Sequence, residues 1–276
     1  WVTLRRISQL SILLLFLAGP LWGLWIVKGN LASSLTLDVL PLTDPHILLQ
    51  AIFAGVTPET AAIIGALIVV AFYMLVGGRV YCSWVCPVNI ITDAACCLRR
   101  WLGIRAKTQI SRSTRYWVLA LTLILPLLTG TIVWEVVNPV SMAFRGIVFG
   151  MGLAWVLLLG IFLFELFVAE HGWCGRLCPV GAFYGLLGNK SLVRVVADKR
   201  EKCDDCMDCY LVCPEPQVIK PALKGASNGI GPVILGQECT NCGRCIDCCP
   251  EEVFSFGTRF ANKSVAIGNK REVPEI

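Results

Sequence analysis

Residues 203–214 read CDDCMDCYLVCP, and residues 239–250 repeat the pattern as CTNCGRCIDCCP. Both runs have the spacing C-x2-C-x2-C-x3-C-P. Three thiolates two residues apart in a tight loop can hold three corners of one iron–sulfur cubane, and the fourth cysteine, followed by proline, ligates the cluster of the other run. Zinc, the alternative metal, is bound by paired C-x2-C units rather than by such triple runs. The runs therefore predict a small α+β ferredoxin domain with two [4Fe–4S] clusters.

The predicted ligands form two crossed sets. The first set is Cys203, Cys206, Cys209 and Cys249, and the second is Cys239, Cys242, Cys245 and Cys213. The remaining cysteines of this part and of the central loop, Cys248, Cys96 and Cys97, fit no ligand pattern and receive no role. The chain has no Gly-rich nucleotide fingerprint after a strand and only two histidines, which argues against a flavin, NAD or several bis-His haems. Such a domain carries electrons.

The rest of the chain has the composition of a membrane protein. Hydrophobic residues make up 56% of the sequence and charged residues only 16%, too few to cover a soluble surface. Uncharged apolar runs of about 20 residues, the length of a membrane-spanning helix, occupy Ile7–Val27, Thr60–Gly77, Tyr116–Trp134 and Gly146–Phe164. We expect an all-α membrane domain of four transmembrane helices over residues 1–197, the ferredoxin domain over 198–260 and a solvated tail over 261–276.

The orientation of the spans follows from the basic residues. The segment between the second and third runs contains Arg79, Arg99, Arg100, Arg105, Lys107, Arg112 and Arg115. The other two connecting segments contain one basic residue each, Lys28 and Arg145, and Arg5 and Arg6 precede the first run. The N-terminus, the central loop and the ferredoxin domain are therefore predicted to face the cytoplasm.

The predicted membrane domain contains an internal repeat. Residues 80–89, VYCSWVCPVN, match residues 172–181, GWCGRLCPVG, at an offset of 92. Upstream, Asp44-Pro45 resembles Asn138-Pro139. Each copy precedes an outside-to-inside span and ends it with C-x3-C-P. The pattern predicts a parallel two-plus-two duplication about an axis along the membrane normal.

The duplicated C-x3-C-P motifs bring Cys82, Cys86, Cys174 and Cys178 to the cytoplasmic membrane face. Three interpretations stay open: buried cysteines that pack as small hydrophobic residues, a dithiol–disulfide shuttle in contact with quinone, and ligands of an iron or iron–sulfur centre. The third is favoured because C-x3-C-P is also the end of each ferredoxin run.

Acidic residues and a histidine lie near these motifs. Glu165 lies at the end of the fourth predicted span, directly after Phe164. An acid in a span is by default a functional candidate, although it can equally pair with an arginine. Glu170 and His171 precede Cys174. Because quinol oxidation releases protons, Glu165, Glu170 and His171 are candidate catalytic residues that accept them.

Taken together, the motifs resemble the NapH family. The similar segments are Pro41–Pro45, Cys82–Pro87, Asn138–Ser141, Glu170–Gly175 and Lys202–Pro216. The resemblance implies four membrane helices, two cytoplasmic [4Fe–4S] clusters and a location in the bacterial inner membrane. It also implies oxidation of membrane quinol with a NapG-like periplasmic iron–sulfur partner, and electron delivery to a downstream multihaem cytochrome or nitrate reductase. No nucleic-acid partner is expected.

Two other functions compete with a quinol dehydrogenase subunit. One is a maturation or metal-reducing membrane protein of the kind that contains ferredoxin and C-x3-C-P motifs. The other is a docking scaffold whose clusters are structural or redox-sensing. Quinol-dependent reduction of the clusters separates the first function from the scaffold, and copper reduction identifies the metal-reducing protein.

Overall fold

The computed structural model describes residues 1–104, 108, 110–150 and 152–261, and the chain forms two compact units. The ferredoxin unit comprises Trp1–Arg5, Tyr73–Ser83 and Gly185–Ile276, and the helical unit comprises Arg6–Phe72 and Trp84–Tyr184. Both units thus combine segments distant in sequence, and Tyr73–Ser83 joins the ferredoxin unit. Arg105 and Lys107 of the predicted basic loop, and residues 262–276 of the predicted tail, lie outside the described residues.

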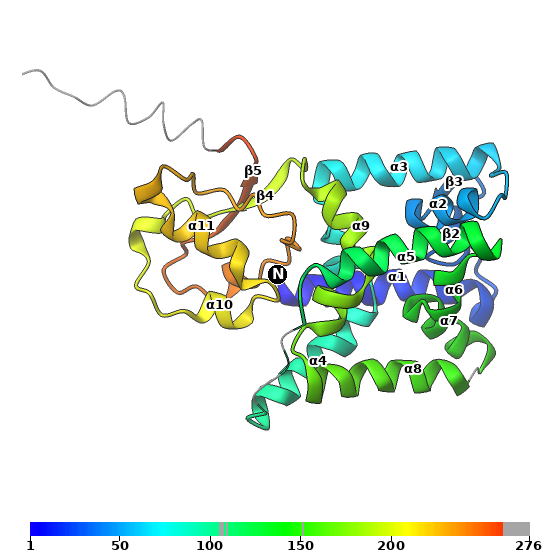
Figure 1. Cartoon of the computed structure of the whole chain (residues 1–276), viewed down its shortest axis with the longest axis horizontal. Helices are drawn as coiled ribbons and strands as arrows, with labels where there is room; N and C mark the ends of the chain where they lie inside the picture. The colour runs from blue at the N-terminus through cyan, green and yellow to red at the C-terminus, as the bar shows by residue number, and fades with distance from the viewer. Residues whose placement is uncertain (105–107, 109, 151, 262–276) are drawn as a thin grey trace, which may run out of the picture. The chain divides into compact units, whose positions relative to one another are not determined.

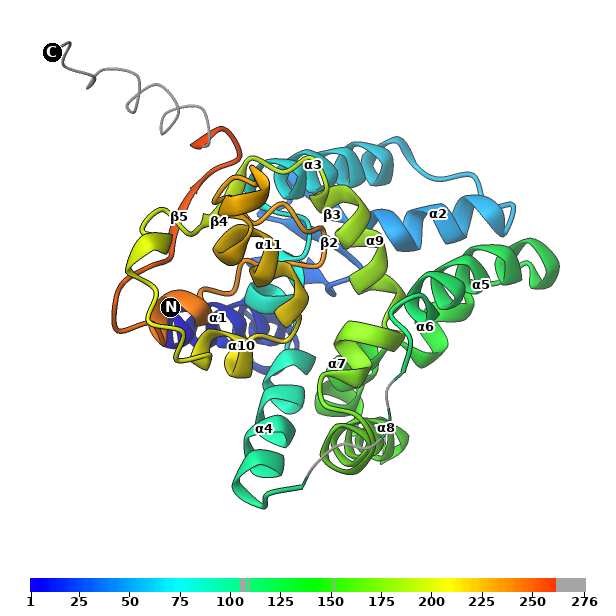
Figure 2. The ribbon, with the colours of Figure 1, turned by 60° about the vertical axis from the view of Figure 1, so that its left-hand side comes forward.

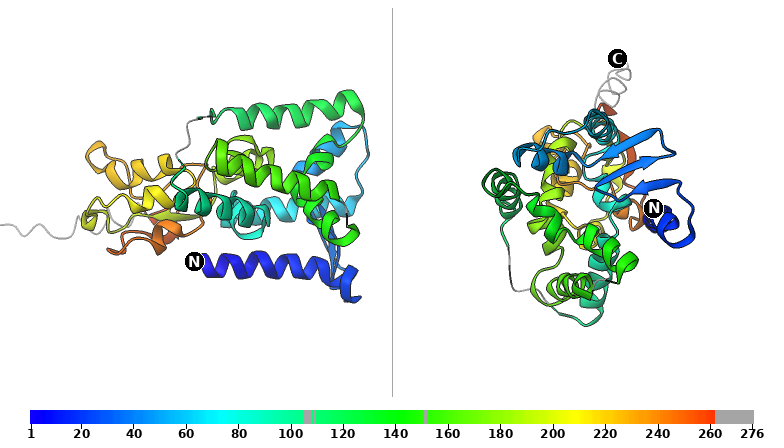
Figure 3. Two further views of the ribbon diagram at one scale, coloured as in Figure 1. Left: turned by 90° about the horizontal axis from the view of Figure 1, so that it is seen from below. Right: turned by 90° about the vertical axis from the view of Figure 1, so that its right-hand side faces the viewer.

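The long apolar runs form helices. These are α1 (Val2–Trp22), α3 (Thr60–Val76), α5 (Thr114–Thr129) and α8 (Gly152–Leu163). Their axes are roughly parallel (Figure 1), and the right-hand view of Figure 3 shows them end-on. Two ends are set by glycines in the left-handed region, which Gly adopts without steric cost: Gly130 has φ 64° after α5, and Gly150 has φ 66° before α8.

These helices differ in length from the predicted spans. Within the described part of the chain, α1 is the one helix long and apolar enough to cross a membrane, by length and composition. The helices Thr60–Val76, Thr114–Thr129 and Gly152–Val168 are apolar but shorter. The fourth predicted run, Gly146–Phe164, is divided at Gly150, so its first part belongs to α7 (Pro139–Phe149).

Short elements lie together at one end of the parallel helices (Figures 1 and 3). They are the antiparallel sheet β1 (Val27–Gly29), β2 (Ser33–Thr36) and β3 (Leu40–Thr43), together with α2 (Pro45–Phe53), α6 (Val133–Val137) and α7. Asp44 and Asn138 cap α2 and α7 by accepting backbone N–H bonds from His46 and Val140, as N-cap residues do. The repeated Asp/Asn-Pro signature therefore marks two equivalent helix starts.

The C-x3-C-P motifs connect short π-helices to α-helices. The elements are η1 (Tyr81–Val85) before α4 (Val88–Trp101), and η2 (Phe164–Val168) and η3 (Trp173–Leu177) before α9 (Pro179–Gly188). Two of these, η1 and η3, contain the first cysteine of each motif in the wide π turn, a form that occurs frequently at functional sites. The prolines after Cys86 and Cys178 then start new helices.

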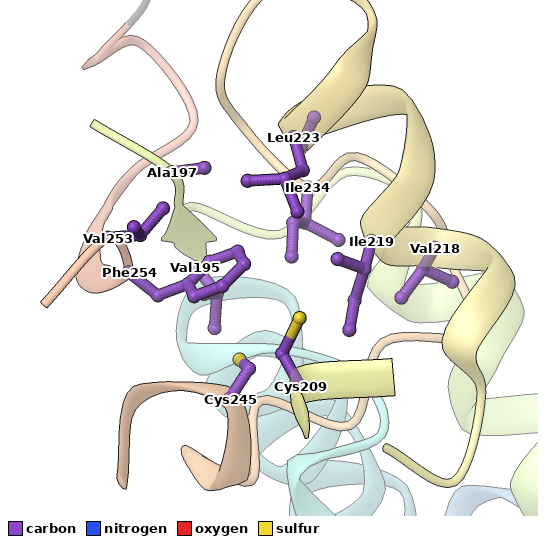
Figure 4. Packing of buried hydrophobic residues seen from close by; sticks show 11 residues of the cluster. Val195, Ala197, Cys209, Val218, Ile219, Leu223, Ile234, Cys245, Val253 and Phe254 are labelled. Carbon is purple, nitrogen blue, oxygen red and sulfur yellow. The ribbon is translucent and has the colours of Figure 1, made fainter. Parts of the chain in front are cut away.

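The ferredoxin unit combines strands and short helices. Strand β4 (Val193–Val196) pairs antiparallel with β5 (Ser255–Thr258), with Val195 opposite Phe256. The helices are η4 (Arg200–Lys202), α10 (Asp208–Val212), η5 (Pro216–Val218), α11 (Ile219–Lys224), η6 (Ala226–Asn228) and α12 (Arg244–Asp247); Figure 2 shows α10, α11 and both strands. The core contains Val195, Ile219, Ile234, Val253 and Phe254, with Cys209 and Cys245 at its border (Figure 4). Each cysteine run is therefore anchored to one apolar core.

Candidate functional site

The cysteines of the two runs gather in crossed groups. Cys203, Cys206, Cys209 and Cys249 line one cavity, beside Tyr210 and Phe254. In the other group, burial and then the neighbouring Cys242 raise the pKa of both Cys213 and Cys245. The cavity is lined by the members of the first predicted ligand set, and the binding of clusters by the two sets stays a prediction. A ring of four thiols around an apolar cavity fits a cubane, whose ligands are thiolates.

The two cysteine loops have the same backbone shape. Asp205 and Met207 have φ of 64° and 67°, and the equivalent Asn241 and Gly243 have φ of 47° and 75°. Such left-handed residues turn successive N–H groups toward one concave side, which favours a bound anion. The Asp205 and Asn241 side chains also face the thiols of Cys203 and Cys239, at 3.7 and 3.5 Å. The loops are therefore shaped by their non-cysteine residues for an anionic group.

The first C-x3-C-P motif reaches the second cysteine run inside the ferredoxin unit. Ser83, next to Cys82, donates a hydrogen bond from Oγ to the Thr240 carbonyl oxygen at 2.7 Å. Thr240 is in turn next to Cys239. Consecutive α-carbons are ~3.8 Å apart, so this bond holds the α-carbons of Cys82 and Cys239 within about 15 Å of one another. The structure thus brings one predicted membrane cysteine near one predicted cluster ligand.

Two further polar contacts hold this segment in place. Asn241 Nδ2 donates to the carbonyl oxygens of Val193 at 2.9 Å and Val76 at 3.4 Å. Arg79 Nη1 lies 3.1 Å from Glu215 Oε1 and donates to the Glu238 carbonyl oxygen at 2.8 Å. Both side chains of the ion pair are buried, with 2% and 1% of their surface exposed. Arg79, which the sequence identifies only as an orienting charge, is therefore a structural residue of the ferredoxin unit.

The other C-x3-C-P cysteines belong to the helical unit, and all are partly buried. Cys86 packs beside Trp173 against an apolar cluster that includes Val88 and Ile161. Cys174 Sγ lies 3.8 Å from the Thr92 hydroxyl. Because Cys82 lies in the ferredoxin unit and Cys86, Cys174 and Cys178 lie in the helical unit, the convergence of all four thiols stays a prediction.

Glu165 is fully buried and organises the loop before η3. Its carboxylate oxygens accept the backbone N–H groups of Gly172 at 3.0 Å and Trp173 at 2.9 Å. Arg99 Nη1 donates to the Glu165 carbonyl oxygen at 2.7 Å. These contacts hold His171, which has a positive φ of 51°, an uncommon conformation that depends on such support. Glu165 therefore positions the residues that follow it.

The three predicted proton acceptors meet at Cys96, a residue that fits no ligand pattern in the sequence. Cys96 Sγ lies 3.7 Å from His171 Nδ1 and 3.9 Å from Glu165 Oε2. Ligand atoms of Cys96, Glu170 and His171 all lie within 4.8 Å of one another. Burial and then the charge of Glu165 raise the pKa of Cys96 to about 12. Glu170 is exposed and also lines an open polar groove with Arg112 and Arg176.

A second buried polar group lies at the opposite end of the helical unit. Asp44 caps α2, and His46 Nε2 lies 3.2 Å from Thr122 Oγ1. Burial raises the pKa of Asp44 to about 7, with a further contribution from Glu135, and burial lowers the pKa of His46 to about 4. Gln50 contacts His46 and accepts the Trp134 backbone N–H at 3.2 Å. These residues connect α2, α5 and α6.

Comparison with known proteins adds independent evidence. The 4Fe-4S binding domain family matches residues 59–105 and again 151–197, so the matches lie 92 residues apart (151 − 59), the offset of the internal repeat. They cover the C-x3-C-P motifs rather than the two ferredoxin runs. No solved structure matches the chain significantly.

Three curated relatives cover most of the chain. It is 52% identical to the ferredoxin-type protein NapH of Haemophilus influenzae, over 93% of this chain and 89% of that protein. It is 54% identical to the methylamine utilization ferredoxin-type protein MauN of Paracoccus denitrificans, over 94% and 90% of the two chains. The putative electron transport protein YccM of Escherichia coli is 26% identical over 95% of this chain and 77% of its own length.

Proposed function

The chain belongs to the ferredoxin-type family of NapH and MauN proteins, and from this premise we propose that it is the membrane electron-transfer subunit of a quinol dehydrogenase. In this function it oxidises membrane quinol and passes electrons through iron–sulfur centres toward a periplasmic reductase of the nitrate reductase type. Its partners are a NapG-like periplasmic iron–sulfur protein and a downstream multihaem cytochrome or reductase. The electron-transfer role follows from the family, and quinol and the acceptor are the proposal.

The proposal places the helical unit in the bacterial inner membrane with four spans. Its support is the apolar surface of every long helix. Exposed large hydrophobic residues include Leu14 on α1, Leu67 on α3, Trp117 and Leu128 on α5, and Val156 on α8. Apolar surface of this extent on a soluble monomer would cause association, whereas acyl chains can cover it. The basic central segment supports a cytoplasmic location for both termini and the ferredoxin unit in this proposal.

Two crossed cysteine groups of the ferredoxin unit would hold the [4Fe–4S] clusters, which supply one-electron transfer when bound. Cys82, Cys86, Cys174 and Cys178 are proposed as the ligands of an additional iron or iron–sulfur centre. The match of the 4Fe-4S binding domain family to both C-x3-C-P segments supports iron at these thiols over a structural role or a dithiol shuttle.

The observation that carries the proposal is the hydrogen bond from Ser83 to the Thr240 carbonyl. It fixes a C-x3-C-P motif against a cluster-binding loop, and the buried Arg79–Glu215 pair holds the same segment. An electron carrier needs such fixed, short separations between redox groups. A docking scaffold does not need a membrane motif to be held against a cluster loop.

Glu165, Glu170 and His171 are the candidate acceptors of the quinol protons. The two backbone bonds to Glu165 favour a positioning role for this residue. Glu170 is exposed on the polar groove and can exchange protons with water.

A second candidate function is electron transfer in methylamine utilization instead of nitrate reduction. The similarity to MauN is as high as the similarity to NapH, so the same membrane subunit could act in methylamine utilization. The two roles differ in the periplasmic protein that exchanges electrons with the chain.

Quinol-dependent cluster reduction tests the proposal. The purified full chain, with its clusters oxidised, is mixed anaerobically with a menaquinol or ubiquinol analogue, and reduction is followed by electron paramagnetic resonance. We expect reduction by the native chain and by Cys97→Ala, and strongly slowed reduction after Cys86→Ser or Cys178→Ser. Equal rates after replacement of all four C-x3-C-P cysteines would refute a redox role for them, and no reduction by any quinol would refute the quinol dehydrogenase itself.

A further inference from the structure

We infer that Cys96, Glu170 and His171 form a binding site for a single divalent transition-metal ion of the Zn2+ class, separate from the iron–sulfur ligands. The three side chains come from α4 and from the loop between η2 and η3. Their ligand atoms lie within 4.8 Å of one another. The inference goes beyond the proposed electron transfer, because none of these residues belongs to a C-x3-C-P motif or to a ferredoxin run.

The donor set and the spacing suit such an ion. A thiolate, an imidazole nitrogen and a carboxylate oxygen are the three ligand types that Zn2+ takes in proteins, at about 2.3, 2.0–2.1 and 2.0–2.2 Å. Two ligands at these distances in a tetrahedral arrangement are roughly 3.5 Å from each other. The separation of 3.7 Å between Cys96 Sγ and His171 Nδ1 is therefore close to that of a pair sharing one ion. Harder ions such as Mg2+ prefer oxygen ligands.

The surroundings have the features of a metal centre. Glu165 Oε2 lies 3.9 Å from Cys96 Sγ, and the same carboxylate accepts the backbone N–H groups that follow His171. Residues in this outer position orient ligands and add negative charge near the cation. Glu170 also lines the polar groove, so an ion has a path from solvent and a side from which water can supply a fourth ligand.

The internal repeat provides a comparison within the same chain. At the offset of 92, Cys96 corresponds to Gly188, Glu170 to Gly78 and His171 to Arg79. In the ferredoxin unit a Cβ on Gly188 would lie only 3.0 Å from the Gly78 nitrogen and 3.1 Å from its α-carbon. The helix after one C-x3-C-P motif thus approaches the loop before the other motif in both cases. In the ferredoxin unit the helix and the loop meet at two glycines, Gly188 and Gly78. In the helical unit the equivalent contact has three metal-ligating side chains. The fold can therefore form this contact without such side chains.

A bound ion changes the role of two residues. It occupies the lone pairs of His171 and Glu170 that a proton acceptor would use. The metal site therefore competes with the proton-accepting role of these residues. Zinc content is measured without turnover, so failure of the metal site and failure of quinol oxidation are distinguishable.

The test uses the full chain with its iron–sulfur clusters. The protein is equilibrated with Zn2+, freed of excess metal by gel filtration, and analysed for zinc, iron and acid-labile sulfide. We expect one zinc per chain in the native protein and in Cys97→Ala, the neighbouring exposed cysteine on the same helix. Cys96→Ala and His171→Asn should lose it with unchanged iron and sulfide. Asn tolerates the positive φ at this position, so His171→Asn remains informative if Cys96→Ala does not fold.

Zinc X-ray absorption identifies the ligands directly. One sulfur and otherwise nitrogen or oxygen neighbours are expected, and Glu165→Gln should weaken zinc binding by about 10–100-fold through ligand orientation. Zinc retained by both Cys96→Ala and His171→Asn, a shell of several sulfurs, or no zinc bound by the native chain would each overturn the inference.

Discussion

Replacing Arg79 by Met should destabilise the ferredoxin unit by about 3–5 kcal/mol. Arg79 and Glu215 are buried, at 2% and 1% exposure, and their charged atoms lie 3.1 Å apart. Removing one partner of a buried ion pair leaves the other charge uncompensated, which carries a cost of this size, whereas replacing both partners by apolar residues is often neutral. Glu215 also accepts a hydrogen bond from Gln217 Nε2 at 2.8 Å, but that neutral amide does not replace the charge of Arg79. Solvent screening does not reduce the effect at this burial.

The assay is the rate at which iron–sulfur absorbance is lost in a fixed, moderate guanidinium concentration under anaerobic conditions. When opening of the unit precedes cluster loss, the rate follows the equilibrium population of the open form. A tenfold change corresponds to about 1.4 kcal/mol, so Arg79→Met should accelerate loss by roughly 100- to 4000-fold. The exposed Lys199–Glu252 pair provides a control, because Lys199→Met should change the rate by less than about fivefold.

The double variant Arg79→Met/Glu215→Met isolates the pair. It should recover most of the lost stability, since no charge is then left buried. If the single variant lost absorbance at the native rate, or if the double variant were as unstable as the sum of the single ones, the pair would not anchor Tyr73–Ser83.

Four further outcomes are expected. Reporters at Lys224 and near Asp38 should lie on opposite sides of the membrane; the same side for both would contradict the orientation. Cys249→Ser should eliminate the spectroscopic signal of the cluster assigned to Cys203, Cys206 and Cys209, and loss of the other signal instead would disprove crossed ligation. The pKa of the Asp44 carboxyl is raised from 3.8 to about 7 in the folded protein. Between about pH 4 and 7 the folded state therefore binds a proton that the unfolded chain does not, so the free energy of unfolding falls as the pH rises through this range. Asp44→Asn should remove this dependence, at most about 4 kcal/mol, measured as thermal stability in detergent at pH 5 and 8; parallel profiles would refute it. Met207→Gly should stabilise the chain against cluster loss by about 0.5–1 kcal/mol, because Met207 has φ 67° where the other loop has Gly243; a destabilised variant would show that the strain is absent.

The sequence predicted what depends on local spacing. The cysteine runs lie in loops whose shape is determined within a few residues, so their positions could be predicted from spacing alone, and their crossed ligation stays a prediction. The apolar runs likewise formed helices. The break at Gly150 could not be predicted, because a glycine inside an apolar run is compatible both with a helix that continues and with a helix that ends there. The strands between Val27 and Thr43 were also missed, because the segment is short and its exposure does not alternate strictly along each strand.

The features that escaped prediction depend on long-range contacts. Cys96 and His171 are 75 residues apart, and neither lies in a repeated cysteine motif. The useful signal was the difference between the two copies, since Cys96 corresponds to Gly188. The structural role of Arg79 was missed for a similar reason. A basic residue beside a predicted span indicates membrane orientation, and the buried partner of Arg79 lies 136 residues further along the chain.

That separation has a consequence for biosynthesis. Tyr73–Ser83 is translated long before Glu215, and at 5–20 residues per second the ribosome needs roughly 7–27 s to synthesise the 136 residues between Arg79 and its partner. All four predicted spans precede Glu215 in the chain and are synthesised by then, while the ferredoxin unit still lacks its second cysteine run. If the ligands are crossed as predicted, neither cluster has its full set of four thiols until the second run, residues 239–250, has been translated.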